Sequence, residues 1–449
     1  MSQKKFNVFL NSKISPFSKI IKVDSDKSMS IRSFLISSIS QNISKIKNVL
    51  ESEDVLSTIE ACKKLGIKIK KIQPSTYKIY GKGLGSFFAK KNTKLNFGNS
   101  GTLARLLIGI LSTTPDIELK IQGDHSLNKR SMKELILLMS KFGADFLPKN
   151  KFNFPLKILS SKIPFGINYK AGESAQLKSA VIFAGLNSHG STSIEEKIIS
   201  RDHTENLLKE NKGVINIKKK NKKKIIKIFG KKKLDSINVN VSGDPSSAAF
   251  FTTLTLLNPN SSLKIKNVGL NSTRIGFYKI LMKQKAKIKF INLRKQNNEL
   301  TGDILVKSSK LRPIKTPPEI YSSTTDEYLL LFLIASFQNG ISIFKGISGL
   351  ANKESSRAHE MKKILNQLGV KCMLNKNIMK IYGNGMINAS KKKILVNNLG
   401  DHRVAMCAFI LAVLTNAKTL IKNFETVFTS SPSFLKIMTD LGAKFEIQN

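Results

Sequence analysis

The sequence has 449 residues, which is longer than a chain that folds around a single hydrophobic core usually is, so two domains are expected. Its hydrophobic and charged fractions of 41% and 23% are ordinary for globular proteins. No apolar run approaches the roughly 18 residues that span a bilayer, and the polar residues after Met1 argue against a secretion signal, so we expect a cytoplasmic protein. The net charge of +45 would suit a protein that binds nucleic acid, but the lysines are dispersed along the chain and form no single basic patch, so no nucleic-acid partner is expected.

One pattern recurs along the chain: a polar cluster, an apolar run of helical length, a turn and a short strand. The six clusters begin near residues 26, 99, 174, 244, 325 and 401. The apolar runs predict helices over Leu103–Leu111, Ala180–Leu186, Ala248–Leu257, Tyr328–Phe337 and Val404–Leu414. Strands are predicted over Ile117–Gln122, Ser191–Glu195, Ser262–Lys266 and Ile341–Lys345. Each unit is therefore predicted to be β-α-β-α-β-β.

Six such units predict two domains of three, in the α/β (α+β) fold class. The last unit ends after Ile447 without its final strand, whereas the first 25 residues carry strand patterns at Phe6–Leu10 and Lys19–Val23 without an opening cluster. We therefore expect the N-terminal segment to complete the sixth unit. The domains would then be discontinuous, one formed by residues 26–243 and the other by residues 1–25 plus 244–449.

Two further features have plain structural explanations. The densest basic cluster, Lys218–Lys224, lies between two Ile-rich stretches, Val214–Ile217 and Ile225–Ile228, which is typical of a solvated hairpin. The cysteines lie in apolar surroundings without metal-ligand spacing, so buried reduced thiols and no metal site are expected. They are Cys62, Cys372 and Cys407.

The polar clusters are good N-caps, so capping alone could explain them. However, they also carry groups that caps do not need, such as Lys27, Gln176 and Arg403. Helix N-termini attract phosphate and carboxylate. Only nine of the 75 basic residues are arginine, which indicates positions that need a planar, bidentate cation, although Arg105 and Arg274 are candidates for structural roles. We therefore expect the helix starts to converge on an anion-binding cleft between the domains.

These motifs, in this order, resemble the enolpyruvyl transferase family, and within it the second class of 5-enolpyruvylshikimate-3-phosphate (EPSP) synthases. Asp26–Arg32 resembles the family's first substrate-binding motif, and Phe97–Arg105 its glycine-rich phosphoenolpyruvate loop. Gly123–Arg130 is similar to the segment that supplies a phosphoenolpyruvate arginine. Ser174–Ala180 and Ser200–Glu205 are similar to the second class in particular.

The C-terminal half continues the resemblance. Gly243–Phe250 resembles the hinge-region motif, and Asp326–Tyr328 the segment of the catalytic aspartate. Asn352–Arg357 is similar to the family's Lys-Glu-Ser-Asp-Arg motif, with serine at position 356, and Asp401–Met406 to its Asp-His-Arg element. The resemblance covers nearly the whole chain and implies two domains of three β-α-β-α-β-β repeats each, an inside-out α/β barrel.

The implied activity is transfer of the enolpyruvyl group of phosphoenolpyruvate to the 5-hydroxyl of shikimate 3-phosphate, with release of phosphate. This is the sixth step of the shikimate pathway towards chorismate and aromatic amino acids. The resemblance further implies a monomer without a cofactor. An addition–elimination of this kind needs a base, an acid and cations for the anionic substrates. By the resemblance, Asp326 would accept the hydroxyl proton, Glu354 would protonate the methylene, and Lys27 would bridge both substrates.

The resemblance also implies a set of binding residues. For shikimate 3-phosphate they are Lys27, Ser28, Arg32, Ser174, Ala175, Gln176, Arg201, Asp326 and Lys353. For phosphoenolpyruvate they are Lys27, Asn99, Gly101, Arg130, Gln176, Arg357 and Arg403. Thr429 departs from the better-known class, which has a lysine there. Gly101 stands where alanine narrows the pocket against glyphosate in some second-class enzymes, so we expect glyphosate to inhibit this chain.

Two alternatives remain open at this stage. The sister enzymes that transfer enolpyruvate to UDP-N-acetylglucosamine share the repeat, but they typically use a loop cysteine, and no cysteine of this chain lies in such a loop. A basic RNA-end-processing relative of the same repeat would require a clustered basic face, which the dispersed lysines do not favour.

Overall fold

The computed structural model describes residues 5–90, 92–221, 223–385, 387, 389, 391–397 and 399–448. The chain divides into two compact units. Unit 1 comprises Met1–Asp24, Ser242–Arg294 and Leu300–Asn449, and unit 2 comprises Ser25–Val241 and Lys295–Glu299. Residues 1–4 and 449, at the two ends of the second predicted domain, lie outside the described residues.

Unit 2 contains three four-stranded sheets. The first sheet has the strand order β14 (Asn238–Asn240), β3 (Gln41–Lys47), β5 (Thr76–Lys82) and β4 (Lys68–Gln73). The second has the order β6 (Lys94–Asn96), β7 (Glu118–Gln122), β9 (Leu156–Leu159) and β8 (Asp145–Leu147). The third has the order β10 (Asn168–Ala171), β11 (Ser191–Glu196), β13 (Lys223–Phe229) and β12 (Ile215–Lys220). Its helices are α1 (Lys27–Ile39), α2 (Glu53–Lys64), α3 (Gly101–Leu111), α4 (His125–Lys129), α5 (Lys133–Ser140), α6 (Ala175–Leu186) and α7 (His203–Leu208).

The other three sheets belong mainly to unit 1. The fourth sheet has the strand order β16 (Ile288–Gln296), β17 (Glu299–Lys307), β15 (Ser262–Gly269) and β2 (Ser18–Ile21). The fifth has the order β18 (Lys315–Thr316), β19 (Asn339–Lys345), β21 (Ile378–Asn384) and β20 (Lys371–Leu374). The sixth has the order β22 (Lys393–Asn397), β23 (Lys418–Lys422), β1 (Asn7–Leu10) and β24 (Glu446–Gln448). The helices are α8 (Pro245–Leu257), α9 (Gly276–Lys283), α10 (Tyr321–Thr324), α11 (Tyr328–Ser336), α12 (Arg357–Gln367), α13 (His402–Thr415) and α14 (Phe434–Asp440), with 3₁₀ turns η1 (Pro318–Ile320), η2 (Ser348–Asn352) and η3 (Phe424–Thr429).

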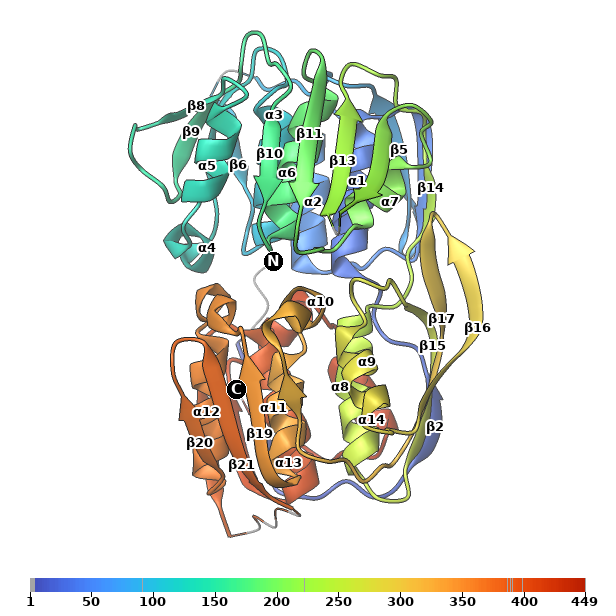
Figure 1. The fold of residues 1–449 in the computed structure, drawn as a ribbon, viewed down its shortest axis with the longest axis vertical. Helices are drawn as coiled ribbons and strands as arrows, with labels where there is room; N and C mark the ends of the chain where they lie inside the picture. Colours follow the sequence, from blue (N-terminus) through green and yellow to red (C-terminus); the bar gives the residue numbers. More distant parts are fainter. Residues whose placement is uncertain are drawn as a thin grey trace. The chain divides into compact units, whose positions relative to one another are not determined.

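The predicted sixfold repeat is confirmed: the described residues form six four-stranded sheets, three from consecutive elements in β-α-β-α-β-β order and three that take one strand from a distant segment. The N-terminal segment is divided between two sheets. β1 pairs with β23 and β24 and so completes the sixth repeat, as predicted. β2, drawn in blue in Figure 1, pairs instead with β15 in the fourth sheet, which the sequence pattern did not predict. In the same way β14 pairs with β3, which belongs to the first of the six repeats.

The helices lie inside and the sheets outside, so the α/β class with an inside-out arrangement is confirmed. In unit 1, helices α8, α11 and α13 contact one another, and every residue of α11 and α13 is buried. In unit 2, α3 contacts both α1 and α6. A helix without a polar face must be covered on all sides. Each unit accordingly has its own hydrophobic core.

The strands show the complementary pattern. In β3, Ile46 is buried whereas Lys45 and Lys47 on either side are exposed, as a sheet with one solvated face requires. The lysine surplus therefore collects on outer sheet faces. β12 and β13 form the predicted antiparallel hairpin, although Lys222 within it lies outside the described residues.

The remaining sequence predictions about the fold can be compared directly. The predicted helices are confirmed, but most begin earlier than the apolar runs; α6 starts at Ala175 and not at Ala180. The three cysteines are free and buried, as predicted, and burial raises the pKa of Cys62 to about 12. Within the described part of the chain, no helix is both long and apolar enough to cross a membrane.

Candidate active site

The polar clusters at the helix starts do act as caps. Asp26 Oδ1 accepts a hydrogen bond of 2.8 Å from Met29 N at α1, and Ser174 Oγ accepts one of 3.3 Å from Leu177 N at α6. Asp401 accepts one of 3.0 Å from Arg403 N at α13. Capping therefore explains the Asp and Ser residues. It leaves unexplained the cations and carboxylates beside them.

In unit 1 the structure brings four predicted site residues together, and the buried guanidinium of one of them, Arg357, lies at the centre. Arg357, at the start of α12, is only 1% exposed. Its Nε lies 2.9 Å from Asp401 Oδ2, its NH2 2.6 Å from Glu354 Oε2, and its NH1 3.4 Å from Asp326 Oδ1. Arg403 NH2 lies 3.6 Å from Asp326 Oδ2. We call Asp326, Glu354, Arg357, Asp401 and Arg403 the Arg357 cluster.

The charges of this cluster reinforce one another. Burial alone would lower the pKa of Arg357, but the carboxylates of Asp401, Glu354 and Asp326 more than offset this and raise it above its usual value. Asp326 in turn lies between two guanidinium groups, which favours its ionised form. The side chains of Asp326 and Glu354 remain 16% and 24% exposed, so a small molecule can reach them.

The five members of the Arg357 cluster come from three places in the chain, at the starts of α11, α12 and α13. Asp326 lies between α10 and α11, where the chain changes direction. Glu354 and the predicted ligand Lys353 lie between η2 and α12. Asp401 is fully buried and caps α13, so its position is fixed by the helix that it starts. The sequence analysis placed Asp401 in a capping cluster and in the Asp-His-Arg element, but it did not predict the contact of Asp401 with Arg357.

In unit 2 the start of α1 supplies Lys27, Ser28 and Arg32. Lys27 Nζ lies 2.9 Å from Asp54 Oδ2 in α2, a partner that the sequence analysis missed. Arg32 is 2% exposed and its guanidinium donates to Thr204 Oγ1 (2.9 Å), Ser179 Oγ (3.3 Å) and the Ser28 hydroxyl. Arg32 thus ties α1 to α6 and α7, in addition to any contact with a ligand.

The predicted phosphoenolpyruvate loop lies at the start of α3. Arg130 NH2 donates to Asn99 Oδ1 and, at 3.2 Å, to Ser126 Oγ, so the two predicted ligands Asn99 and Arg130 meet. Gly101 is close to two arginines, since an added Cβ would lie 2.8 Å from Arg105 NH1 and 3.3 Å from Arg130 NH1. The absence of a side chain at Gly101 keeps this space open for the guanidinium groups.

The third segment of unit 2 is the start of α6. Gln176 Nε2 donates to Thr102 Oγ1 over 2.9 Å, which joins α6 to the start of α3. Ser174 is the N-cap of α6 and Ala175 its first residue. Arg201 lies before α7, immediately after the buried Ser200. The predicted ligands of unit 2 are therefore distributed over neighbouring helix starts that hydrogen bonds connect.

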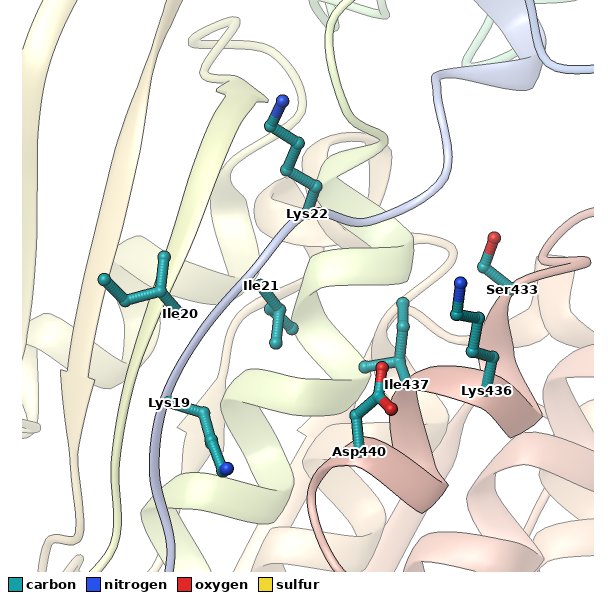
Figure 2. A pocket seen from close by; sticks show the side chains of 8 residues that line it. All are labelled: Lys19, Ile20, Ile21, Lys22, Ser433, Lys436, Ile437 and Asp440. Carbon is teal, nitrogen blue, oxygen red and sulfur yellow. The ribbon is translucent and has the colours of Figure 1, made fainter.

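Two further features lie elsewhere. A pocket of about 450 Å³ in unit 1 lies between β2 and α14 and includes none of the predicted site residues. Figure 2 shows the ammonium group of Lys19 pointing away from those of Lys22 and Lys436, so these cations do not converge on one ligand. Arg274 is buried and its NH2 lies 3.1 Å from Asp244 Oδ1, in agreement with the structural role suggested for it.

Comparisons with known proteins cover nearly the whole length of the chain. Residues 11–438 match the family described as EPSP synthase (3-phosphoshikimate 1-carboxyvinyltransferase). A 3-phosphoshikimate 1-carboxyvinyltransferase of Zymomonas mobilis is 35% identical over 97% of this chain and 96% of its own length.

Solved structures agree. An EPSP synthase from Acinetobacter baumannii superposes with a TM-score of 0.85 at 31% identity, covering 99% of this chain and 100% of that one. The enolpyruvyl transferase NikO from Streptomyces tendae shares the fold alone, with a TM-score of 0.76 at 12% identity and coverage of 99% and 98%. With its repeats, its helix-start motifs and its sequence all in agreement over nearly the full length, the chain belongs to the EPSP synthase family.

Proposed function

We infer that this chain transfers the enolpyruvyl group of phosphoenolpyruvate to the 5-hydroxyl of shikimate 3-phosphate and releases phosphate. This is the reaction of the family to which it belongs, in the shikimate pathway towards chorismate and aromatic amino acids. The structural observation that best supports this reaction is the Arg357 cluster, in which partly exposed carboxylates lie against buried guanidinium groups.

The two carboxylates have the roles that the addition–elimination requires. We propose that Asp326 accepts the proton of the 5-hydroxyl as its oxygen attacks C2 of phosphoenolpyruvate. Arg357 and Arg403 support this role because their guanidinium groups lie 3.4 and 3.6 Å from the Asp326 carboxylate and hold it in position. Glu354 delivers a proton to the methylene carbon, which becomes a methyl group. In the elimination that follows, the bond from C2 to the phosphate oxygen breaks, Glu354 takes a proton back from the methyl group, and the proton that Asp326 accepted leaves with the phosphate.

The anionic groups of phosphoenolpyruvate need several donors. Arg357, Arg403 and Arg130 are assigned to it, together with Asn99, Gly101, Gln176 and Lys27. In the structure, Arg357 NH1 points to Asp326 and NH2 to Glu354, while Asp401 accepts a hydrogen bond from Nε and a longer one of 3.4 Å from NH2. A substrate anion can take over the outer two nitrogens while Asp401 keeps the side chain in place. Bidentate pairing of this kind is a property of arginine.

Shikimate 3-phosphate is assigned to donors on three helix starts of unit 2 and to two residues of unit 1. They are Lys27, Ser28, Arg32, Ser174, Ala175, Gln176, Arg201, Asp326 and Lys353. Backbone N–H groups at a helix N-terminus suit a phosphate. Because both units supply residues, we propose that the substrates bind in a cleft between the domains, which closes on them. X-ray scattering profiles that are identical with and without both ligands would argue against closure.

The setting of the reaction follows from the same assignment. We propose that the chain works as a monomer in the cytoplasm, without a nucleic-acid partner. Gel filtration with light scattering tests the oligomeric state, and a salt-dependent gel shift would contradict the absence of a nucleic-acid partner.

The decisive assay is release of phosphate by the purified chain. Release should require both phosphoenolpyruvate and shikimate 3-phosphate, and the carbon product should carry the enolpyruvyl ether at the 5-position by NMR. Release that depends on UDP-N-acetylglucosamine in place of shikimate 3-phosphate would assign the chain to the sister reaction instead. An Asp326→Asn variant serves as the matched negative control.

A further inference from the structure

Four charged side chains lie inside unit 2, away from solvent. Lys178, Glu196 and Glu205 have fully buried side chains, and that of Lys224 is 6% exposed. Lys178 Nζ lies 2.8 Å from Glu196 Oε1 and 2.7 Å from Glu205 Oε1. Lys224 Nζ lies 3.3 Å from Glu205 Oε1 and 3.6 Å from Glu196 Oε2. We call these four residues the buried quartet.

Stability alone is a poor explanation for the buried quartet. Buried ion pairs can often be replaced by apolar residues without loss of stability, because taking the charges out of water is unfavourable. Lys178 lies in α6, which is otherwise apolar from Ala180 to Leu186. Burial alone would lower the pKa of Lys178, but Glu205 and Glu196 more than offset this and raise it. The ammonium group is therefore retained at neutral pH.

Two members of the buried quartet, Glu196 and Lys178, hold one residue, Ser200. Glu196 Oε1 accepts hydrogen bonds from Ser200 Oγ (2.7 Å) and from Ser200 N (3.2 Å). Lys178 Nζ donates to Ser200 O over 3.5 Å. The hydroxyl, the amide and the carbonyl of Ser200 are thus all held by charged groups. The next residue is Arg201, the proposed ligand of the shikimate phosphate.

Two neighbouring segments of the proposed phosphate site adjoin the buried quartet. Lys178 belongs to the first turn of α6, where its N–H donates to Ser174 O over 3.1 Å. Beside the quartet, Ser179 Oγ lies 2.8 Å from Thr204 Oγ1, and Arg32 Nε donates to that same oxygen over 2.9 Å. The starts of α1, α6 and α7 are therefore joined around the quartet.

We propose that the buried quartet is a positioning device for shikimate 3-phosphate. Lys178, Glu196, Glu205 and Lys224 do not touch the substrate; they fix Ser200 and the start of α6 so that Arg201 and Ser174 are already arranged to receive the phosphate group. The proposal rests on the proposed function, because it takes the roles of Arg201 and Ser174 from it.

The test is Glu196→Gln, which keeps the size of the side chain but removes the charged acceptor for Ser200. The matched control is Glu195→Gln: Glu195 is the neighbour on the same strand, with a side chain 29% exposed and paired with Lys223 at 2.9 Å. In Glu196→Gln the KM for shikimate 3-phosphate should rise roughly 10- to 100-fold, because small displacements of binding groups have effects of this size. The KM for phosphoenolpyruvate, kcat and all constants of the control should stay within about threefold of the wild type.

A second variant keeps the proposal testable if Glu196→Gln does not fold. Lys178→Met/Glu205→Gln removes one charge of each sign and the contact of Lys178 with Ser200 O, and leaves the hydrogen bonds from Ser200 to Glu196. It should raise the KM for shikimate 3-phosphate more than about threefold over the wild type, with kcat and the KM for phosphoenolpyruvate inside that range. A purely structural quartet would lower the melting temperature and the active fraction without a selective change in KM, and this result would overturn the proposal. Wild-type protein that is inactive with both substrates would instead overturn the proposed function.

Discussion

The Arg357 cluster of unit 1 and the buried quartet of unit 2 use the same chemistry for different purposes. Both pair cations with carboxylates at distances below 3 Å. The carboxylates of Asp326 and Glu354 are 16% and 24% exposed, whereas those of Glu196 and Glu205 are not exposed at all. A carboxylate that a substrate can reach can exchange protons with it. One that is sealed from solvent can only hold its neighbours in place.

The comparison predicts that the two regions affect different kinetic constants. Variants of the Arg357 cluster should change kcat and the handling of phosphoenolpyruvate, whereas variants of the buried quartet should change the affinity for shikimate 3-phosphate. Four substitutions outside the buried quartet test this division, in order of decreasing expected effect.

Asp326→Ala should reduce kcat most. Loss of the proposed base removes a contribution that is typically about 10²- to 10⁴-fold, while binding of shikimate 3-phosphate should be largely kept. Steady-state kinetics together with calorimetric titration of shikimate 3-phosphate measure the two quantities separately. Near-normal turnover would reject Asp326 as the base and would remove the main distinction between the two regions.

Arg357→Lys should have the second-largest effect. A lysine keeps the charge but cannot contact Asp401 and Glu354 at the same time, since it lacks the planar fork. We expect kcat/KM for phosphoenolpyruvate to fall roughly 100-fold, with a smaller change in the KM for shikimate 3-phosphate. Arg294→Lys, at an exposed position on β16, is the control and should behave as the wild type. Equal losses for both substrates would count against the assignment of Arg357.

Gly101→Ala should have a smaller and more selective effect. Its new Cβ would meet Arg105 NH1 at 2.8 Å and Arg130 NH1 at 3.3 Å, so both guanidinium groups must move by a few tenths of an ångström. We expect the KM for phosphoenolpyruvate to rise several-fold and inhibition by glyphosate to weaken, the wild type being sensitive. Inhibition curves for both proteins check this. A wild type that already resists glyphosate would contradict the expectation.

The fold could be predicted where the signal is local. Apolar runs of helical length, repeated six times, revealed the buried helices and hence the repeat. The first turns were missed because they contain the polar cap clusters, as at Ala175–Ser179 of α6. The places of β2 and β14 could not be predicted, because each pairs with a strand more than 190 residues away and the sequence carries no local sign of that partner.

The site shows the same limit. Scarcity of arginine selected Arg357, Arg403 and Arg130 in a lysine-rich chain, and the structure brings each of them to another predicted residue. Lysine, in contrast, is so common here that nothing distinguishes Lys178 from its many exposed counterparts. Only tertiary packing shows that Lys178 is buried between two glutamates. Roles that depend on burial are therefore the ones that sequence analysis missed.

Asp303→Asn should have the smallest effect, and it sharpens the comparison by testing a carboxylate of unit 1 that lies outside the Arg357 cluster. Asp303 Oδ1 accepts a hydrogen bond of 2.9 Å from Asn267 N in the irregular part of β15, and Oδ2 accepts one of 2.8 Å from Asn292 Nδ2. Although burial would raise the pKa of Asp303, these hydrogen bonds and Lys264 lower it. Kinetic constants should therefore stay unchanged, while stability falls by about 1 kcal/mol at neutral pH.

The pH dependence of this loss follows from the direction of the shift. A carboxylate whose pKa is lowered by folding stabilises the protein above its unfolded pKa of about 4, and that contribution disappears as the pH falls through the folded pKa. The urea midpoints of the wild type and of Asp303→Asn should therefore differ at pH 7 and approach each other below about pH 4. A difference that persists in acid would mean that the hydrogen bonds act independently of the charge. A loss of kcat would show that unit 1 relies on carboxylates beyond the Arg357 cluster.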